Sequence, residues 1–193
     1  MIHATSETHP IRVDVVPIEG LPGRLGLTIA PGKKGRSHLS RVRWERDLVT
    51  DLRALKERFA TDVLVSLLRR YEYELLEIPK LSAEAERLGL ETRCFEIDDM
   101  SVPDRPRSDA FRDFVAALHA DLTEGRNVTV HCRGGLGRSG LLAACLLVFD
   151  AKAPATAIAR VRSHRPGAIE TRAQEMYVHD FAEGALDRIE PPT

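Results

Sequence analysis

The sequence has few cysteines, few aromatic residues and no long apolar run. Its three cysteines, at positions 94, 132 and 145, are odd in number and are spaced unlike a metal cluster or a disulfide framework. No uncharged apolar stretch reaches the ~18 residues of a membrane helix. Residues 1–10 also lack the basic and apolar segments of a signal peptide. These absences predict a protein that is neither exported nor inserted in a membrane.

An excess of charge of either sign is also missing. The 28 Lys and Arg residues nearly balance the 29 Asp and Glu residues, which gives a net charge of -1 and a pI near 6.7. We therefore expect no nucleic-acid partner and no attraction to an anionic membrane. With 43% hydrophobic residues, the chain can bury one core without staples. We expect a flexible N-terminus over residues 1–12, one folded domain over residues 13–188 and a tail over residues 189–193. Composition does not specify an oligomeric state.

The most informative segment is residues 130–140. It places Cys132, five loop residues and Arg138 between an apolar strand, expected over residues 127–131, and an apolar helix, expected over residues 141–148. A free thiol has a pKa of about 8.5. Glycines can turn successive N–H groups inward, and these amides and the positive end of the helix favour a thiolate at Cys132. The segment predicts a phosphate-binding loop that holds a nucleophile and is lined by Arg133, Gly134, Gly135, Leu136 and Gly137.

Three side chains of this segment have distinct expected roles. The planar fork of Arg138 can hold two phosphoryl oxygens while charge spreads over them during transfer. The Ser139 hydroxyl is expected to donate to the sulfur when it leaves the thiophosphate intermediate. The His131 ring is expected to brace the loop carbonyls rather than to carry a proton. Because a thiolate persists only in a reducing compartment, the segment also predicts a cytoplasmic protein.

A thiolate nucleophile needs a partner that protonates the departing alkoxide. Residues 96–104 end an apolar strand and open a proline-containing loop, where a mobile acid is expected to lie. The loop holds three aspartates, Asp98, Asp99 and Asp104. The residues alone leave the choice among them open.

The pattern Cys-x5-Arg-Ser after an apolar strand resembles the cysteine-dependent protein phosphatases. The string Gly-Gly-Leu-Gly-Arg-Ser at residues 134–139 is similar to the cyclin-dependent kinase inhibitor 3 (kinase-associated phosphatase) branch of the dual-specificity phosphatases. Further similar segments lie at residues 25–28, 31–33, 97–104 and 167–169. The resemblance implies a phosphomonoester hydrolase that forms a phosphocysteine on Cys132 without metal or cofactor. Matching Ile-x-Asp-x-x-x-Pro-Asp to the family makes Asp99 the first choice for the acid, Asp104 the second and Asp98 the third.

The resemblance bears on three other positions. Related phosphatases carry glutamines in the region of residues 167–177, one of which can position the hydrolytic water. Here Glu170 takes the first of these positions, and Gln174 either has that role or packs and caps a helix. Some relatives protect the nucleophile with a disulfide, which Cys94 would form with Cys132 here. The alternative is that Cys94 is a small buried hydrophobe.

Apolar runs alternate with helical patterns along the chain. Strands are expected over residues 13–16, 25–28, 62–68, 92–97 and 127–131. Helices are expected over residues 41–59, 72–77, 82–88, from 108, 141–148, 153–163 and 170–188. This order predicts a single α/β domain with a largely parallel central sheet, helices on both faces and the phosphate loop at the carboxyl end of a strand. The protein tyrosine phosphatase-like fold that the resemblance implies agrees with this.

The substrate is expected to be a phosphorylated protein or peptide. No aromatic-rich segment is present to wall a deep phosphotyrosine slot, so a shallow pocket is expected to accept phosphoserine, phosphothreonine and phosphotyrosine. One alternative is the same mechanism on a non-protein phosphate, such as an inositol lipid or a nucleic acid end. Another is a phosphate-binding module without turnover. Six basic residues either steer an acidic substrate along the cleft rim or form solvated surface: Lys33, Lys34, Arg36, Arg41, Arg43 and Arg133.

Overall fold

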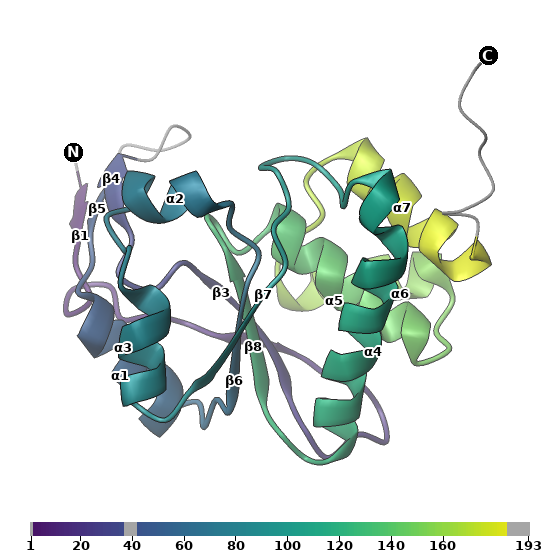
Figure 1. The fold of residues 1–193 in the computed structure, drawn as a ribbon, viewed down its shortest axis with the longest axis horizontal. Helices are drawn as coiled ribbons and strands as arrows, with labels where there is room; N and C mark the ends of the chain where they lie inside the picture. Colours follow the sequence, from purple (N-terminus) through teal and green to yellow (C-terminus); the bar gives the residue numbers. More distant parts are fainter. Residues whose placement is uncertain (1, 37–41, 185–193) are drawn as a thin grey trace.

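The structure, a computed structural model, describes residues 2–36 and 42–184 and has a five-stranded sheet at its centre (Figure 1). The strands lie in the order β2 (Asp14–Val16), β3 (Leu25–Ile29), β8 (Val128–Cys132), β6 (Val63–Ser66) and β7 (Glu91–Cys94). All neighbouring strands are parallel except β2 and β3. The prediction of a largely parallel sheet is therefore confirmed.

Helices cover both faces of this sheet (Figure 1). One face carries α1 (Leu48–Glu57), α2 (Arg70–Leu75) and α3 (Leu81–Arg87), and the other carries α4 (Ser108–Thr123), α5 (Gly137–Phe149), α6 (Pro154–His164) and α7 (Arg172–Glu183). Successive side chains of a strand point to opposite faces. Accordingly, Val63 and Val65 join the core under the second group of helices, whereas Leu64 joins the core under the first. No helix of the described ranges is long and apolar enough to span a membrane.

Helix α5 is the element that positions the predicted loop. Every residue from Gly137 to Leu147 is buried, because α4, α6 and α7 pack around the helix on the sheet. A helix that is apolar all round is stable only in such a setting. The helix begins at Gly137, four residues before the apolar run, so its N-terminus lies next to the carboxyl end of β8.

The N-terminal part of the chain differs from the prediction. Residues 1–12 were expected to be flexible, but β1 (Ile2–Ala4) pairs with β5 (Val42–Glu45), which also pairs with β4 (Lys34–Arg36). The expected helix over residues 41–59 is wrong at its start, because Val42 and Trp44 alternate with charged residues at the period of a strand. The helix begins only after Asp47, whose carboxylate accepts from the Thr50 amide at 2.7 Å.

The C-terminal helix is shorter than the sequence pattern suggested. It was expected over residues 170–188, whereas α7 begins after the Thr171 capping box and is followed by Gly184 in a left-handed conformation. Residues 185–188 of the predicted helix and the tail over residues 189–193 lie outside the described residues.

Candidate active site

Cys132 ends β8 and faces the turn that leads into α5. Its side chain is 3% exposed, and the Gly135 amide donates to its sulfur at 3.2 Å. Gly135 has a φ of 67°, and a Cβ there would overlap the Thr28 carbonyl on the neighbouring strand. Only glycine fits this position, and it turns an amide toward the sulfur as the sequence pattern suggested.

Arg138 lies in the first turn of α5 and is fully buried. Glu72 accepts from both terminal nitrogens, at 2.6 Å and 2.9 Å, and the carbonyls of Leu67 and Ile97 accept from Nη1. Asp99 accepts from Nη2 at 2.9 Å. Burial opposes the charge on Arg138, but the Glu72 hydrogen bonds together with the charges of Cys132, Glu72 and Asp99 outweigh it and raise the pKa of the guanidinium above its ordinary value. Arg138 is therefore a permanent cation with a fixed orientation.

Only one of the three candidate acids reaches Arg138. The Asp99 side chain bonds Arg138 and is 41% exposed. Asp98 instead lies 3.2 Å from the Arg69 guanidinium. Asp104 is exposed and immediately precedes η1 (Arg105–Arg107). The structure thus brings Asp99, the first choice of the sequence analysis, to the arginine of the loop.

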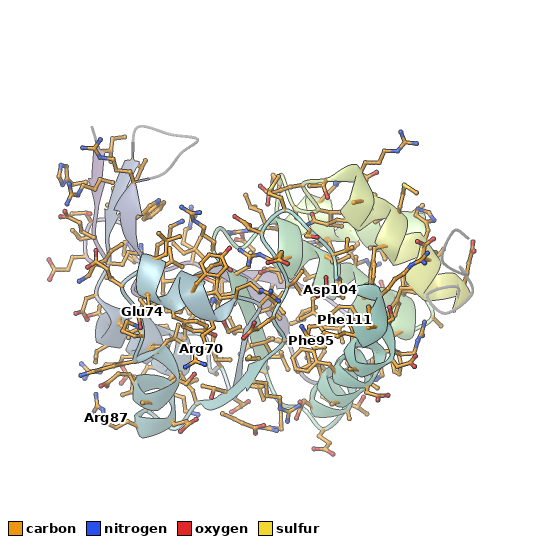
Figure 2. All side chains as sticks on the ribbon, turned by 45° about the horizontal axis from the view of Figure 1, so that its top comes forward. Arg70, Glu74, Arg87, Phe95, Asp104 and Phe111 are labelled. Atoms are coloured by element: carbon orange, nitrogen blue, oxygen red, sulfur yellow. The ribbon has the colours of Figure 1, made fainter. Side chains whose placement is uncertain are left out.

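Aromatic packing supports the segment that carries Asp99. Figure 2 shows Phe95 and Phe111 close together, with their ring centroids 5.1 Å apart. Arg107 stacks over Phe95 at 4.2 Å and donates to the Glu96 carbonyl at 2.9 Å. The segment is therefore held before Asp99, while the turn at Asp99 itself is exposed to solvent.

Two polar side chains beside the nucleophile are buried without partners. Neither ring nitrogen of His131 nor the Ser139 hydroxyl has a hydrogen-bond partner among the described residues. Burial lowers the pKa of His131 to about 4, so its ring is neutral near pH 7. The bracing role that the sequence led us to expect of the ring stays a prediction. The Ser139 hydroxyl remains available to a group in the loop.

Arg165, at the end of α6, braces the loop instead. Its guanidinium donates to the carbonyls of Gly134 and Gly135, at 3.1 Å and 3.0 Å, and to the Asp14 carboxylate at 2.6 Å. With these carbonyls held outward, the amides of the loop are left to face its centre. Arg165 and Glu72 could not be recognised from the sequence, because each is far from the loop along the chain and belongs to no local motif.

Gln174 and Glu170 lie beside the first residue of α5. A Cβ on Gly137 would lie 2.6 Å from a Glu170 carboxylate oxygen and about equally near the Gln174 amide. The Gln174 carbonyl oxygen accepts from the Glu170 amide at 2.9 Å, and its nitrogen donates to the Ser101 carbonyl at 3.0 Å. Gln174 therefore joins the start of α7 to the segment that carries Asp99.

Two of the six predicted rim residues lie at the loop, and the others are dispersed. Lys34 and Arg43, on the small sheet, pair with Glu77 and Glu45, Arg36 is exposed, and Arg41 lies outside the described residues. Arg133 is a residue of the loop itself, and Lys33 donates to the Arg133 carbonyl at 3.1 Å. The surface near Cys132 is therefore less basic than the sequence suggested.

Cys94 is placed badly for a disulfide with the nucleophile. It pairs with Ser66, which pairs on its other side with His131, so two strand spacings of about 4.8 Å separate Cys94 from the β8 backbone. A disulfide needs Cα atoms within about 7 Å. Cys94 is also exposed rather than the buried hydrophobe of the alternative interpretation, and partial desolvation together with the Glu96 charge raises the pKa of its thiol.

The described residues contain no candidate metal-binding cluster. Among residues 2–36 and 42–184, no three His, Cys, Asp or Glu side chains lie together in an arrangement that could hold a metal ion.

The comparisons with known proteins agree with one another. Residues 90–178 match a family model described as PTP-SAK, Swiss Army Knife protein, DSP-PTPase phosphatase domain. The chain is 33% identical over 183 residues to cyclin-dependent kinase inhibitor 3 of Rattus norvegicus. This alignment covers 92% of this chain and 82% of that protein. The Homo sapiens protein of that name is 34% identical over 160 residues, 81% of this chain and 71% of the relative.

Solved structures give the same picture. The crystal structure of kinase-associated phosphatase with its catalytic-site cysteine substituted by serine matches with a TM-score of 0.79 and 27% identity, covering 93% of this chain and 98% of that one. The active form of Tk-PTP matches with a TM-score of 0.65 and 25% identity, covering 88% and 97% of the two chains.

Proposed function

The chain belongs to the dual-specificity, cysteine-dependent phosphatase family that includes cyclin-dependent kinase inhibitor 3, and on this premise we propose that it transfers phosphate through Cys132. The Cys132 thiolate attacks phosphorus, a sulfur–phosphorus bond forms, and the bond to the leaving oxygen breaks. The loop amides and Arg138 hold the phosphoryl oxygens while charge spreads over them. The observation that carries this proposal is the assembly of Cys132, Arg138 and Asp99 at the carboxyl edge of the sheet.

Binding of phosphate to Arg138 also prepares Asp99 as the acid. The Nε of Arg138 is without a partner among the described residues, and the adjacent Nη2 donates to Asp99. These two donors form the edge of the guanidinium that grips two oxygens of a phosphate. A phosphate on that edge displaces Asp99 from Nη2, and the released carboxylate takes up a proton from solvent, which it then delivers to the leaving oxygen. In the second step the same carboxylate takes a proton from the attacking water.

Ser139 and Gln174 support these steps at different places. The Ser139 hydroxyl, buried and without a partner in the described structure, donates to the sulfur when water breaks the sulfur–phosphorus bond. Both ends of the Gln174 side-chain amide are engaged, because its oxygen accepts from the Glu170 and Thr171 amides and its nitrogen donates to the Ser101 carbonyl. We therefore assign Gln174 to holding the Asp99 segment rather than to positioning water.

The substrate class follows from the relatives and from the site. A phosphorylated protein or peptide is the substrate that we assign, because the family is that of the dual-specificity protein phosphatases. We do not assign the kinase in the relatives' names to this chain as its substrate, since docking surfaces outside the loop are formed by other residues. The cytoplasm is the proposed location, because the thiolate needs a reducing compartment.

Hydrolysis of p-nitrophenyl phosphate and of a phosphothreonine peptide tests this function. Both assays contain a thiol reductant and EDTA, and they compare the wild type with Cys132→Ser, Asp99→Ala and Asp104→Ala. The activated leaving group of the first substrate tests the nucleophile, whereas the peptide also requires the acid. We expect Cys132→Ser to abolish both activities and Asp99→Ala to impair peptide hydrolysis more than Asp104→Ala does. Wild-type protein that binds phosphate but turns over neither substrate would contradict the proposal.

A further inference from the structure

Lys33 lies beside the nucleophile although it is outside the Cys-x5-Arg motif. It follows β3, whose last residue, Ile29, pairs with Cys132 across the sheet. The Lys33 residue is only 8% exposed, and its ammonium donates to the Arg133 carbonyl at 3.1 Å. The parallel pairing of β3 with β8 therefore brings a buried cation to the loop.

The turn that holds Lys33 is itself firmly built. The Gly32 amide donates to Asp51 at 2.9 Å, and Asp51 forms a buried ion pair with Arg46 at 2.7 Å. Gly32 has a φ of 70°, and a Cβ there would lie 2.6 Å from the Leu48 side chain. The Lys33 ammonium also lies 5.3 Å from the centre of the Trp44 ring. These contacts fix the direction in which Lys33 leaves the backbone.

The charges around Lys33 oppose one another. Burial, with a smaller effect of the nearby Arg133 and Arg46 guanidinium groups, lowers the pKa of Lys33, whereas Cys132 and Asp99 act to raise it, and the net value is about 8. Lys33 is therefore largely protonated at neutral pH and within electrostatic range of Cys132 and Asp99. Among the described residues, the Lys33 ammonium has one carbonyl as its hydrogen-bond partner and no ion pair, and a buried charge with so few partners reduces stability. Such a group is more readily explained by function than by folding.

We propose that Lys33 is a positioning residue of the phosphate loop, which holds the Arg133 carbonyl and supplies positive charge that favours the Cys132 thiolate and the bound phosphate. This inference rests on the proposed function of Cys132. Lys34 offers a matched control, because it is the next residue, also a lysine, half exposed and paired with Glu77 at 3.7 Å on the small sheet.

Alkylation of Cys132 by iodoacetamide tests the effect on the sulfur without requiring turnover. The reaction is followed as a function of pH for Lys33→Met, Lys33→Arg and Lys34→Met, all in a Cys94→Ser background so that the exposed cysteine does not react. Cys145 is fully buried, and that burial raises the pKa of its thiol, so it does not interfere. We expect Lys33→Met to slow alkylation at mildly acidic pH about tenfold and to move the half-maximal rate to higher pH, as for loss of a nearby opposite charge. Lys33→Arg should recover much of the rate, and Lys34→Met should match the parent protein.

Two further measurements distinguish a positioning role of Lys33 from a structural one. Phosphopeptide kinetics should show kcat/KM about tenfold lower for Lys33→Met than for Lys34→Met. The urea midpoint of Lys33→Met should equal or exceed that of Lys34→Met, because a buried charge has been removed. Equal alkylation profiles and equal kcat/KM for the two variants would overturn the inference while leaving the phosphatase function intact. A lower urea midpoint of Lys33→Met together with slower alkylation would also overturn the inference, because Lys33 would then act by stabilising the fold. A wild type that alkylates normally but turns over no substrate would contradict the proposed function instead.

Discussion

Replacing Glu72 by glutamine removes the buried negative charge that holds Arg138. Both Glu72 oxygens accept from the guanidinium, at 2.6 Å and 2.9 Å, and both side chains are at most 2% exposed. Breaking a buried ion pair by removing one partner typically destabilises a protein by about 3–5 kcal/mol. Glutamine keeps the volume and one acceptor oxygen, so we expect a loss near the lower end, about 3 kcal/mol in the free energy of unfolding.

Urea unfolding followed by circular dichroism measures this loss. With a slope of about 2 kcal/mol per molar urea, the midpoint should fall by about 1.5 M. The same preparation should show a lower kcat/KM for p-nitrophenyl phosphate, because glutamine keeps only one of the two acceptor oxygens that orient the Arg138 guanidinium. Asp99 then becomes the single carboxylate on Arg138, and its release for catalysis becomes harder.

Glu74 provides the control on the same helix. It is exposed on α2, two residues after Glu72, and is labelled in Figure 2. Glu74→Gln should change the free energy of unfolding by no more than about 0.5 kcal/mol. A Glu72→Gln midpoint and kcat/KM equal to those of this control would refute the reasoning. The double variant Glu72→Leu with Arg138→Met should regain stability without activity, because a buried pair can be replaced by apolar side chains.

Other expectations concern the loop and its surroundings. Arg165→Ala should raise the inhibition constant of inorganic phosphate about tenfold, whereas Arg160→Ala on the same helix should leave it unchanged; equal constants would exclude the bracing role. Because the folded pKa of His131 is depressed to about 4, its neutral form contributes stability above pH 6.5 that is lost as pH falls toward 4. The wild type should therefore lose about 2 kcal/mol more than His131→Gln between pH 7 and pH 5, as measured by urea unfolding. After peroxide treatment, peptide mapping should find no disulfide between Cys94 and Cys132, and such a disulfide would contradict the strand order.

The central loop could be predicted because its parts are contiguous in the sequence. The apolar strand, the glycines and the apolar helix follow one another within residues 127–148, and local patterns report such elements well. Asp99 was reached as the first choice for the acid by motif matching, and the structure places its carboxylate on Arg138. The parallel sheet with helices on both faces followed from the alternation of strands and helices.

The contacts of the supporting residues could not be predicted from local patterns, although Lys33 was one of the six basic residues expected at the cleft rim or on solvated surface. Glu72, Lys33 and Arg165 come to the loop from α2, from the end of β3 and from the end of α6, and only the order of strands and helices brings them together. Arg165 holds the carbonyls of Gly134 and Gly135, although the sequence led us to expect such bracing from His131, which is buried. The small N-terminal sheet was missed because Val42 also fitted the helical stripe that continues in α1.

Transfer of phosphate through the Cys132 sulfur can be observed directly. Ser139→Ala removes the hydroxyl expected to help sulfur leave, so the intermediate should accumulate on this variant. The variant is mixed with a peptide carrying radiolabelled phosphate, quenched in alkaline detergent and digested, and the labelled fragment is identified. We predict that the label lies on the fragment containing Cys132 and is absent when Cys132→Ser is added. Turnover with no label on the protein, or with label on another residue, would contradict a phosphocysteine mechanism.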